Sequence, residues 1–203
     1  MKEEIKILKD SLLINLKDMV QKQGLYLGNG ILKVDKFINH QVTPSLMNEI
    51  GKYFGKCFEE NGITKILTAE SSGIVPAYAT ANYLNIPMVF ARKKKPITMK
   101  ETYYKTAPSH TKGGIVEIHV SKEMISDEDK ILIVDDFLAS GKTLKVLSEI
   151  VIDSGAELCG ITAVIEKNFE NGREILENEF KVPVISLLKI LSMDDSKIEI
   201  ADY

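Results

Sequence analysis

The sequence predicts an α/β fold, in which a mainly parallel, twisted sheet is covered by helices on both faces. Amphipathic segments of helical length alternate along the chain with short apolar runs of strand length. One such run, Ile131 to Val134, holds only apolar residues, most of them β-branched, which is typical of a parallel strand buried on both faces. The chain has 203 residues, of which 44% are hydrophobic, enough for one domain with its own core. We therefore expect a single domain over residues 1–203.

The chain begins with a predicted helix, a hairpin and a second helix. Apolar side chains at helical spacing predict a first helix that stops at Gly24. The sequence Gly28-Asn29-Gly30 separates two short apolar pieces and predicts a small hairpin. Thr43 and Pro44 predict a capped start for the second helix, and Asn61-Gly62 predicts its end.

From residue 65 onward, strands and helices alternate more regularly. The expected elements are a strand at 65–69, a helix at 74–84, strands at 88–91, 115–120 and 131–134, a helix at 143–153, a strand at 160–165 and a short helix at 173–178. Residues 97–114 show no clear periodicity. This segment, with Tyr103, Tyr104 and Lys105, is predicted to be a lid that excludes water from a site.

The segment from Ile131 to Thr143 has the pattern of a ligand site. Two adjacent carboxylates, Asp135 and Asp136, follow the apolar run, and a short turn with small residues then opens a helix. In open α/β sheets ligands bind at the carboxyl ends of strands, and N–H groups at a helix N-terminus bind phosphate. Carboxylates repel phosphate but accept hydrogen bonds from hydroxyls or bind a divalent cation. A ligand with both phosphate and vicinal hydroxyls, such as a 5-phosphoribosyl group, satisfies both halves of the motif.

Two other interpretations compete with this one. Gly141-Lys142-Thr143 resembles the end of a Walker-type P-loop, but that motif needs a glycine five positions before Gly141, where this chain has Asp136. The segment could also be an ordinary turn in which Ser140 caps the helix and the acids are solvated. The combination of a buried strand, paired acids and a small-residue turn favours a ligand site over both.

Two further segments carry groups that suit anions. Glu70-Ser71-Ser72-Gly73 lies between a predicted strand and a helix, so its N–H groups and hydroxyls can bind an anion. A plain serine-rich helix cap is the alternative, and the second phosphate-type loop in the same sheet argues against it. Arg92-Lys93-Lys94-Lys95 directly follows another predicted strand. Such runs usually form solvated faces, but in an acidic protein these cations are well placed to meet pyrophosphate.

These segments carry a resemblance to a known family. The run from Ile131 to Thr143 resembles the PRPP-binding motif of the type I phosphoribosyltransferases. Four more segments resemble the bacterial xanthine phosphoribosyltransferases: GILKVDKFIN at 30–39, GITKILTAESSGIVPA at 62–77, VFARKKK at 89–95 and IEKNF at 165–169. The resemblance runs over most of the chain and thins at 97–114 and after about residue 183.

The resemblance implies the type I phosphoribosyltransferase fold, with a small hood formed by about 25–40 and the C-terminal segment. It implies transfer of 5-phosphoribosyl from PRPP to xanthine, which gives xanthosine 5′-monophosphate and pyrophosphate. Asp135 and Asp136 would hold the ribose hydroxyls, and Arg92 would reach the pyrophosphate of the neighbouring subunit in a homodimer. Mg²⁺ would be held mainly through PRPP, without direct protein ligands. The PRPP-binding residues would be Glu70, Ser71, Ser72, Gly73, Ala139, Ser140, Gly141, Lys142 and Thr143.

Residues on other segments are candidates for contact with the purine. Lys167 follows a predicted strand, and its ammonium group suits the carbonyl oxygen of a 6-oxopurine rather than the amino group of adenine. Phe137 and Phe169 could stack on a base, although each taken singly is more typical of a core. By the resemblance, Leu32 and Asn39 match positions of the xanthine-binding hood.

One position departs from the wider family. The hypoxanthine-guanine enzymes carry an Asp that meets N7 of the purine, where this chain has Ala139. The motif therefore leaves no carboxylate for acid–base chemistry at N7. Solvent, ionisation of xanthine or a residue that the sequence does not identify would then handle the proton.

Composition and charge narrow the class of protein further. The net charge of −3 and the pI of about 5.7 argue against a nucleic-acid partner. Residues 1–20 lack the apolar stretch of a signal peptide, and no run reaches the ~18 apolar residues of a membrane span. Cys57 and Cys159 are too few and too far apart to suggest a metal site. We therefore expect a cytoplasmic enzyme that binds no membrane.

Two alternatives to a xanthine-specific enzyme remain open at the level of sequence. One is a phosphoribosyltransferase that prefers hypoxanthine or guanine. The other is a PRPP-sensing regulator that has kept the fold and lost catalysis. About two dozen residues precede the predicted hairpin, which is too few for a winged-helix module, and the acidic charge also disfavours a regulator that binds nucleic acid.

Overall fold

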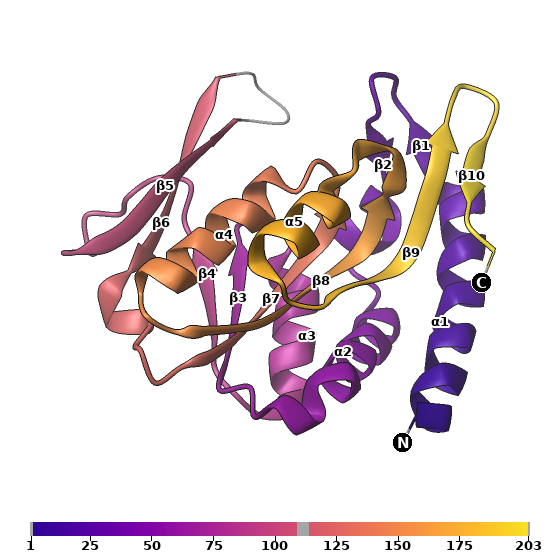
Figure 1. Cartoon of the computed structure of the whole chain (residues 1–203). Helices are drawn as coiled ribbons and strands as arrows, with labels where there is room; N and C mark the ends of the chain where they lie inside the picture. The colour runs from indigo at the N-terminus through magenta and orange to yellow at the C-terminus, as the bar shows by residue number, and fades with distance from the viewer. Residues whose placement is uncertain (1, 109–113, 203) are drawn as a thin grey trace.

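The structure is a computed structural model that describes residues 2–108 and 114–202. Its centre is a six-stranded sheet (Figure 1). Its strands lie in the order β10-β9-β8-β7-β3-β4. All neighbours pair in parallel except β10, which is antiparallel to β9. The strands are β3 (Lys65–Ala69), β4 (Met88–Ala91), β7 (Lys130–Leu138), β8 (Glu157–Lys167), β9 (Val184–Met193) and β10 (Ile198–Ile200). The predicted α/β fold is therefore confirmed.

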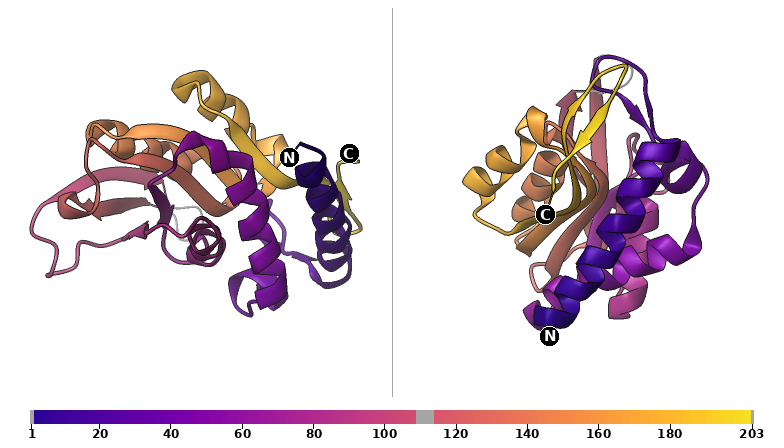
Figure 2. Two further views of the ribbon diagram at one scale, coloured as in Figure 1. Left: turned by 90° about the horizontal axis from the view of Figure 1, so that it is seen from below. Right: turned by 90° about the vertical axis from the view of Figure 1, so that its right-hand side faces the viewer.

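Helices cover both faces of this sheet (Figure 2). One face carries α1 (Lys2–Gln23), α2 (Pro44–Phe58) and α3 (Ile74–Leu84), and the other carries α4 (Lys142–Asp153) and α5 (Gly172–Phe180). Strand β7 explains why two layers are needed: Leu132 and Val134 belong to the core under α1–α3, whereas Ile131 and Ile133 belong to the core under α4. All four side chains are fully buried, as the continuous apolar run predicts. Among the described residues, no helix is long and apolar enough to cross a membrane.

The predicted hairpin near the N-terminus is present. Strands β1 (Leu25–Tyr26) and β2 (Leu32–Lys33) pair in antiparallel fashion around a turn in which Gly28, Asn29 and Gly30 all have positive φ. A short π-helix (Asp35–Asn39) follows. The tip of this hairpin lies beside the turn between β9 and β10 in Figures 1 and 2. The expected hood that these two segments would form stays a prediction.

Strand β7 is longer than its apolar run suggests. The apolar run predicted a strand over 131–134 with Asp135 and Asp136 at its C-terminal end, but the strand runs on past both acids, because pairing with β8 continues to Leu138. Pairing with β3 ends earlier, at Ile133. The last part of β7 therefore extends beyond one neighbour while the other still fixes its backbone.

The segment predicted as a lid contains a strand. Residues 102–108 form β5 (Thr102–Pro108), which pairs with β6 (Ile115–Ser121) in an antiparallel hairpin separate from the main sheet. Lys105 is fixed to α4 by an ion pair of 2.8 Å between its Nζ and Oδ2 of Asp153. Residues 109–113 of the expected lid lie outside the described residues. Local sequence did not predict β5, because its pairing depends on a partner strand that lies further along the chain.

Three short 3₁₀ turns complete the described secondary structure, at Glu59–Asn61, Lys122–Met124 and Asn168–Glu170. The last of these is called η4 below. The start of α2 differs in detail from the prediction: Pro44 begins the helix, but the hydroxyl of Thr43 makes no capping hydrogen bond.

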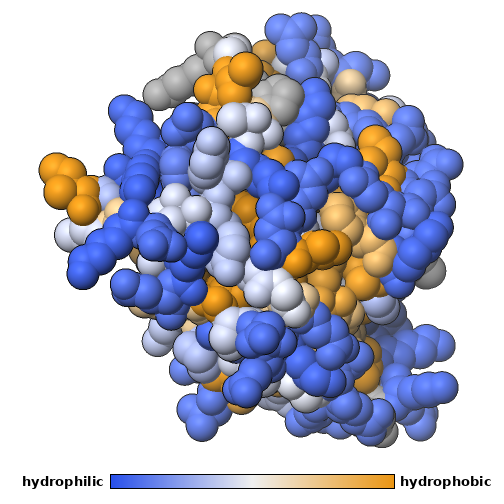
Figure 3. Space-filling model, turned by 60° about the vertical axis from the view of Figure 1, so that its left-hand side comes forward, coloured by the Kyte–Doolittle hydropathy of each residue, from blue (hydrophilic) through white to orange (hydrophobic). Residues whose placement is uncertain are grey.

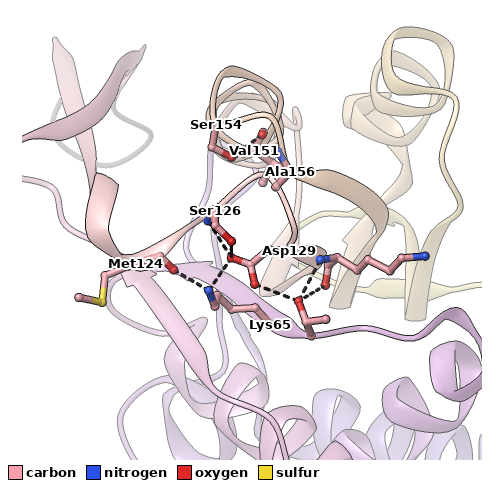
Figure 4. A network of polar contacts seen from close by, with 9 residues as sticks. Lys65, Met124, Ser126, Asp129, Val151, Ser154 and Ala156 are labelled. Carbon is pink, nitrogen blue, oxygen red and sulfur yellow. Dashed lines mark hydrogen bonds and ion pairs between the residues drawn. The ribbon is translucent and has the colours of Figure 1, made fainter.

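A polar network ties β3 to the loop before β7 at the amino ends of these strands (Figure 4). The Nζ atom of Lys65 lies 2.6 Å from Oδ2 of Asp129 and donates to the Met124 carbonyl at 2.8 Å. Asp129 also accepts hydrogen bonds from the Thr64 hydroxyl and the Ser126 N–H group. Burial by itself raises the pKa of Asp129, but these donors and the Lys65 charge outweigh burial and leave its pKa lowered.

Replacement Asp129→Ala should therefore destabilise the fold by about 1–3 kcal/mol near neutral pH, because Lys65 and the Ser126 N–H group lose their acceptor. A lowered folded-state pKa gives stability that is present above the ordinary value of 3.8 and is lost as the pH falls through the lowered value. Urea unfolding of both proteins should thus show a difference that shrinks below about pH 4. An equal difference near pH 7 and near pH 3 would mean that only packing was lost.

Candidate active site

A cavity of about 640 Å³ lies at the carboxyl ends of the parallel strands. Its lining comes from the residues at and after the ends of β3, β4, β7 and β8, and from the β1–β2 hairpin with the π-helix that follows. This is the edge at which open α/β sheets bind ligands, because the loops there diverge and helices begin with their N–H groups directed outward. The cavity collects most of the residues that the sequence singled out.

Two buried acids form one wall of the cavity. Asp135 and Asp136 are 8% and 6% exposed, and the Asp136 N–H group donates to Oδ1 of Asp135 at 3.0 Å. Burial, followed by the charge of Asp136, raises the pKa of Asp135 well above its ordinary value, while Lys93 acts in the opposite direction. Two adjacent buried carboxylates are costly for a fold, so this arrangement marks a functional site rather than a structural one.

The loop after β3 presses against these acids. A Cβ atom at Gly73 would lie 2.2 Å from Oδ1 of Asp135 and 2.5 Å from Oγ1 of Thr68, so only glycine fits there. The Thr68 hydroxyl is fully buried and has no hydrogen-bond partner among the described residues. Thr68 was not singled out from the sequence, since a threonine inside a strand is ordinary. Glu70 and Ser72 line the cavity, whereas the exposed Ser71 and the buried Gly73 do not.

The predicted phosphate loop lies between β7 and α4. Ala139, Gly141, Lys142 and Thr143 line the cavity, and Ser140 lies between them in the loop. Gly141 has φ of 75° at the N-cap of α4, a conformation that favours glycine and lets the chain turn into the helix. The first turn of α4 therefore presents its N–H groups and the positive end of its dipole to the cavity.

Helix α5 supports this loop from behind, a contact that the sequence did not indicate. A Cβ atom at Gly172 would lie 2.2 Å from the Ala139 carbonyl oxygen and 2.6 Å from the Gly141 nitrogen. Arg173 fixes the start of α5 to the end of β8: its Nε and Nη2 lie 2.9 Å and 2.6 Å from the two carboxylate oxygens of Glu166. Burial raises the pKa of Glu166, but hydrogen bonds from Arg173 and Ser186 outweigh it and leave the pKa lowered.

The basic run after β4 contributes one side chain to the cavity lining, that of Lys93. Arg92 lies outside the lining, with its Nε 2.8 Å from Oε2 of Glu70 in an ion pair that lacks the geometry of a hydrogen bond. The N–H group of Lys93 donates to the other carboxylate oxygen of Glu70 at 2.7 Å. Through these two contacts, Glu70 fixes the start of the basic run to the loop after β3 of the same chain. The reach of Arg92 into a neighbouring subunit stays a prediction.

The opposite end of the cavity carries most of the residues expected to contact a base. Leu32, Asn39, Phe137 and Lys167 line it, and the Lys167 Nζ atom lies 5.5 Å from the centre of the Phe137 ring. Phe169 does not line it: this side chain is 41% exposed and lies under the β1–β2 turn, with its ring edge 3.9 Å from where a Cβ of Gly30 would be. The expected stacking role therefore suits Phe137 better than Phe169.

Several lining residues were not identified from the sequence. The hairpin adds Leu27 and Ile31, and an ion pair of 3.5 Å joins Lys33 to Asp35 at the edge of the cavity. Glu170 lies on η4 with its Oε1 3.5 Å from Nζ of Lys167. Charged residues such as Lys33, Asp35 and Glu170 are typical of any protein surface, so the sequence does not mark them as part of a site. They reach the cavity only because the fold brings the hairpin next to the end of β8.

The donor set of the cavity fits a cation that arrives with its ligand. Within the described parts of the chain, no group of three or more His, Cys, Asp or Glu side chains is arranged to hold a metal ion. Asp135 and Asp136 offer carboxylate oxygens, the donor type that Mg²⁺ prefers. Two carboxylates can accept hydrogen bonds from the hydroxyls of a sugar or bind a hydrated cation that the ligand carries.

Comparison with known proteins identifies the family to which the chain belongs. A family model described as "Phosphoribosyl transferase domain" matches residues 41–186, which is more than half of the chain. The chain therefore belongs to the phosphoribosyltransferase family. The resemblance indicated by the motifs is thus confirmed.

Within this family, the chain is similar over most of its length to proteins named xanthine phosphoribosyltransferase. One from Listeria innocua is 47% identical over 184 residues, which cover 90% of this chain and 95% of the relative. Another from Deinococcus deserti is 48% identical over 181 residues, which cover 89% and 93%. The crystal structure of adenine phosphoribosyltransferase from Rhodothermus marinus is similar with a TM-score of 0.74 at 26% identity, covering 89% of this chain and 99% of that chain.

Replacement Asp135→Asn should stabilise the protein in the absence of ligands while it impairs turnover. A raised folded-state pKa of a carboxyl group means that stability falls as the pH rises from the ordinary 3.8 through the raised value. The substituted amide keeps an oxygen acceptor for the Asp136 N–H group, so we expect a gain of about 1 kcal/mol near pH 7 that vanishes near pH 4. Turnover of PRPP should fall about 10²-fold in kcat/KM. Lower stability near pH 7, measured by denaturant unfolding, would contradict the assignment of Asp135 as a costly buried acid.

Replacement Gly172→Ala should displace the phosphate loop, because the new methyl group would overlap the Ala139 carbonyl. We expect kcat/KM for PRPP to fall by about 10²-fold, the effect of roughly 1 Å of misplacement. The exposed Glu174→Ala in the same helix is the control and should leave PRPP kinetics unchanged. Equal kinetics for the two variants would show that the loop adapts without cost.

Proposed function

We propose that this chain transfers the 5-phosphoribosyl group of PRPP to xanthine, releasing pyrophosphate and forming xanthosine 5′-monophosphate. The observation that carries the proposal is the cavity that joins the buried acids, the helix α4 N-terminus and Lys167. The extensive similarity to proteins named xanthine phosphoribosyltransferase supports the same activity. Such a transfer would serve purine salvage.

The lining residues divide into groups with different roles in this reaction. The N–H groups of Ala139 to Thr143 would bind the 5′-phosphate, while Asp135 and Asp136 would accept the ribose hydroxyls. Positive charge grows at the anomeric carbon as the bond to pyrophosphate breaks, and the two carboxylates would offset it. The work of the protein is therefore positioning and electrostatic stabilisation.

The leaving pyrophosphate would lie near the loop Glu70 to Gly73 and the cation of Lys93. Mg²⁺, bound together with PRPP, would neutralise part of the charge that develops on this group. Because Glu70 holds both Arg92 and the Lys93 backbone, it would set the position of these cations relative to the loop. In this arrangement the protein need not supply a complete metal site of its own.

The base would lie between Phe137 and the hairpin, with its 6-oxo group at Lys167. An ammonium group donates hydrogen bonds and accepts none, so it disfavours the 6-amino group of adenine. Such a preference would favour 6-oxopurines over adenine, the base in the name of the structurally similar enzyme from Rhodothermus marinus. Asn39 can both donate and accept at another edge of the base.

We further propose that the active form is a homodimer. Strand β4 lies at the edge of the sheet and carries the exposed Phe90, and Tyr78 is exposed on α3, a helix that contacts β4. The basic run follows directly, which would let it contribute to a partner's site. Figure 3 shows the side of the molecule nearest the β5–β6 hairpin, where apolar areas alternate with hydrophilic ones. Sedimentation of the purified protein at several concentrations tests this state, and a monomer throughout would contradict it.

A direct assay separates this function from the alternatives. Purified protein, Mg²⁺ and PRPP are mixed in turn with xanthine, hypoxanthine, guanine and adenine, and the nucleoside monophosphate is measured. We expect xanthine to be used and adenine to be rejected. A chain that binds PRPP but converts no base would be a PRPP-sensing regulator instead.

Replacement Lys167→Met should lower kcat/KM for xanthine by roughly 10- to 10²-fold, because an unpaired buried carbonyl costs about 1–3 kcal/mol. Methionine keeps most of the side-chain volume, so KM for PRPP and thermal stability should change little. The loss for xanthine should exceed the loss for hypoxanthine, since xanthine has a second oxygen and ionises more readily. Small, equal losses for all bases would place base recognition elsewhere.

A further inference from the structure

Thr68 carries a buried hydroxyl that the proposed reaction leaves without a task. Its side chain is fully buried on β3, and its Oγ1 has no hydrogen-bond partner among the described residues. Two other fully buried threonines differ: Thr80 donates to the Pro76 carbonyl at 2.8 Å, and Thr162 donates to the Ile133 carbonyl at 3.3 Å. A buried hydroxyl without a partner is costly for a fold, so its presence calls for a functional explanation.

The hydroxyl lies where two neighbouring strands stop pairing. Pairing of β3 with β7 ends at Leu67 and Ile133, one residue before Thr68. On its other side, β3 is still paired with β4 through Thr68 and Phe90. The backbone of Thr68 is therefore fixed by β4, while the strand that carries the paired acids no longer pairs with it.

The nearest identified acceptor is the carboxylate of Asp135. A Cβ atom at Gly73 would lie 2.2 Å from Oδ1 of Asp135 and 2.5 Å from Oγ1 of Thr68, so both oxygens border one small space that the glycine leaves free. Oδ1 accepts a hydrogen bond from the Asp136 N–H group, and an ionised carboxylate oxygen has a second lone pair. Asp135 lines the cavity but Thr68 does not, so the hydroxyl can influence a ligand through Asp135 without touching it.

We propose that Thr68 is a positioning residue: in the complex with PRPP, its hydroxyl donates to the carboxylate of Asp135 and fixes that carboxylate toward the ribose hydroxyls. The inference rests on the proposed phosphoribosyl transfer and deepens it by adding a donor behind the acids. A hydrogen bond to a charged acceptor is stronger than one between neutral groups. The donor is unused in the free protein and used in the complex, so it contributes to binding of PRPP rather than to folding.

The variant Thr68→Val tests this role, because valine keeps the branched shape and removes the hydroxyl. Stability of the ligand-free protein in urea should not fall, because the lost hydroxyl had no partner. We expect kcat/KM for PRPP to fall by about tenfold. The rise in Tm that Mg²⁺ and PRPP produce should become smaller, a readout that needs no turnover. Thr68→Ser keeps the hydroxyl and should restore kcat/KM to within about threefold.

Thr80→Val is the matched control. This threonine is equally buried, but its hydroxyl already donates within α3 and lies outside the cavity lining. The expected pattern is the opposite one: the ligand-free protein loses stability while PRPP kinetics stay unchanged. If Thr68→Val behaved like this control, or if Thr68→Ser failed to restore turnover, Thr68 would serve packing alone and the inference would be overturned.

A double-mutant cycle shows whether the hydroxyl acts through Asp135. In an Asp135→Ala background, which removes the acceptor, Thr68→Val should lower kcat/KM by less than about twofold. Losses that multiply in full would mean that the hydroxyl acts elsewhere, which would also overturn the inference. Failure of the unchanged protein to convert any purine would instead overturn the proposed function, and the Tm response to PRPP would still test Thr68.

Discussion

Burial of two adjacent carboxylates at the end of β7 is the constraint on which the rest of the site depends. The hydrogen-bonded ladder to β8 keeps Asp135 and Asp136 in an extended strand after pairing with β3 has ended. The loop after β3 must then pass within contact of Asp135, which only a glycine at position 73 allows. The fold thus accepts an unfavourable charge arrangement in the absence of ligand, and a ligand with hydroxyl groups would relieve it.

A second layer of contacts holds the ligand-binding loops in place. Gly172 brings the start of α5 against the phosphate loop, and the buried pair of Glu166 with Arg173 fixes α5 to the strand that carries Lys167. The two ends of the cavity are therefore supported through the same short stretch of chain. A change at the start of α5 should influence the binding of both PRPP and the purine, although no α5 side chain lines the cavity.

Charge is distributed unevenly along the cavity. Lys142 and Lys93 lie with the loops that suit phosphates, the two aspartates lie at the expected ribose position, and the base end carries the balanced pair of Lys167 and Glu170. In the proposed reaction, the cations beside these loops would attract PRPP, and the ammonium group of Lys167 would donate to the 6-oxo group of the base.

Local sequence determined the elements whose signal lies within a few residues. The bounds of β3, α3 and β4 agree with the prediction, as does the hairpin around Gly28 to Gly30, because apolar periodicity and turn glycines act locally. The motif from Ile131 to Thr143 likewise predicted the acids and the phosphate loop, since their spacing along one strand and one turn fixes their proximity.

Tertiary structure decided everything that depends on pairing between distant segments. Residues 102–108 of the expected lid form β5, which had no local signal because it is stabilised by pairing with β6 rather than by its own pattern. Phe169, expected beside the base, does not line the cavity and is 41% exposed near the hairpin turn. Thr68, Gly172 and Glu170 had no local signal at all. Each acquires its place only when strands and helices far apart in sequence meet at one edge of the sheet, because the energy of burial and charge pairing is set by neighbours in space.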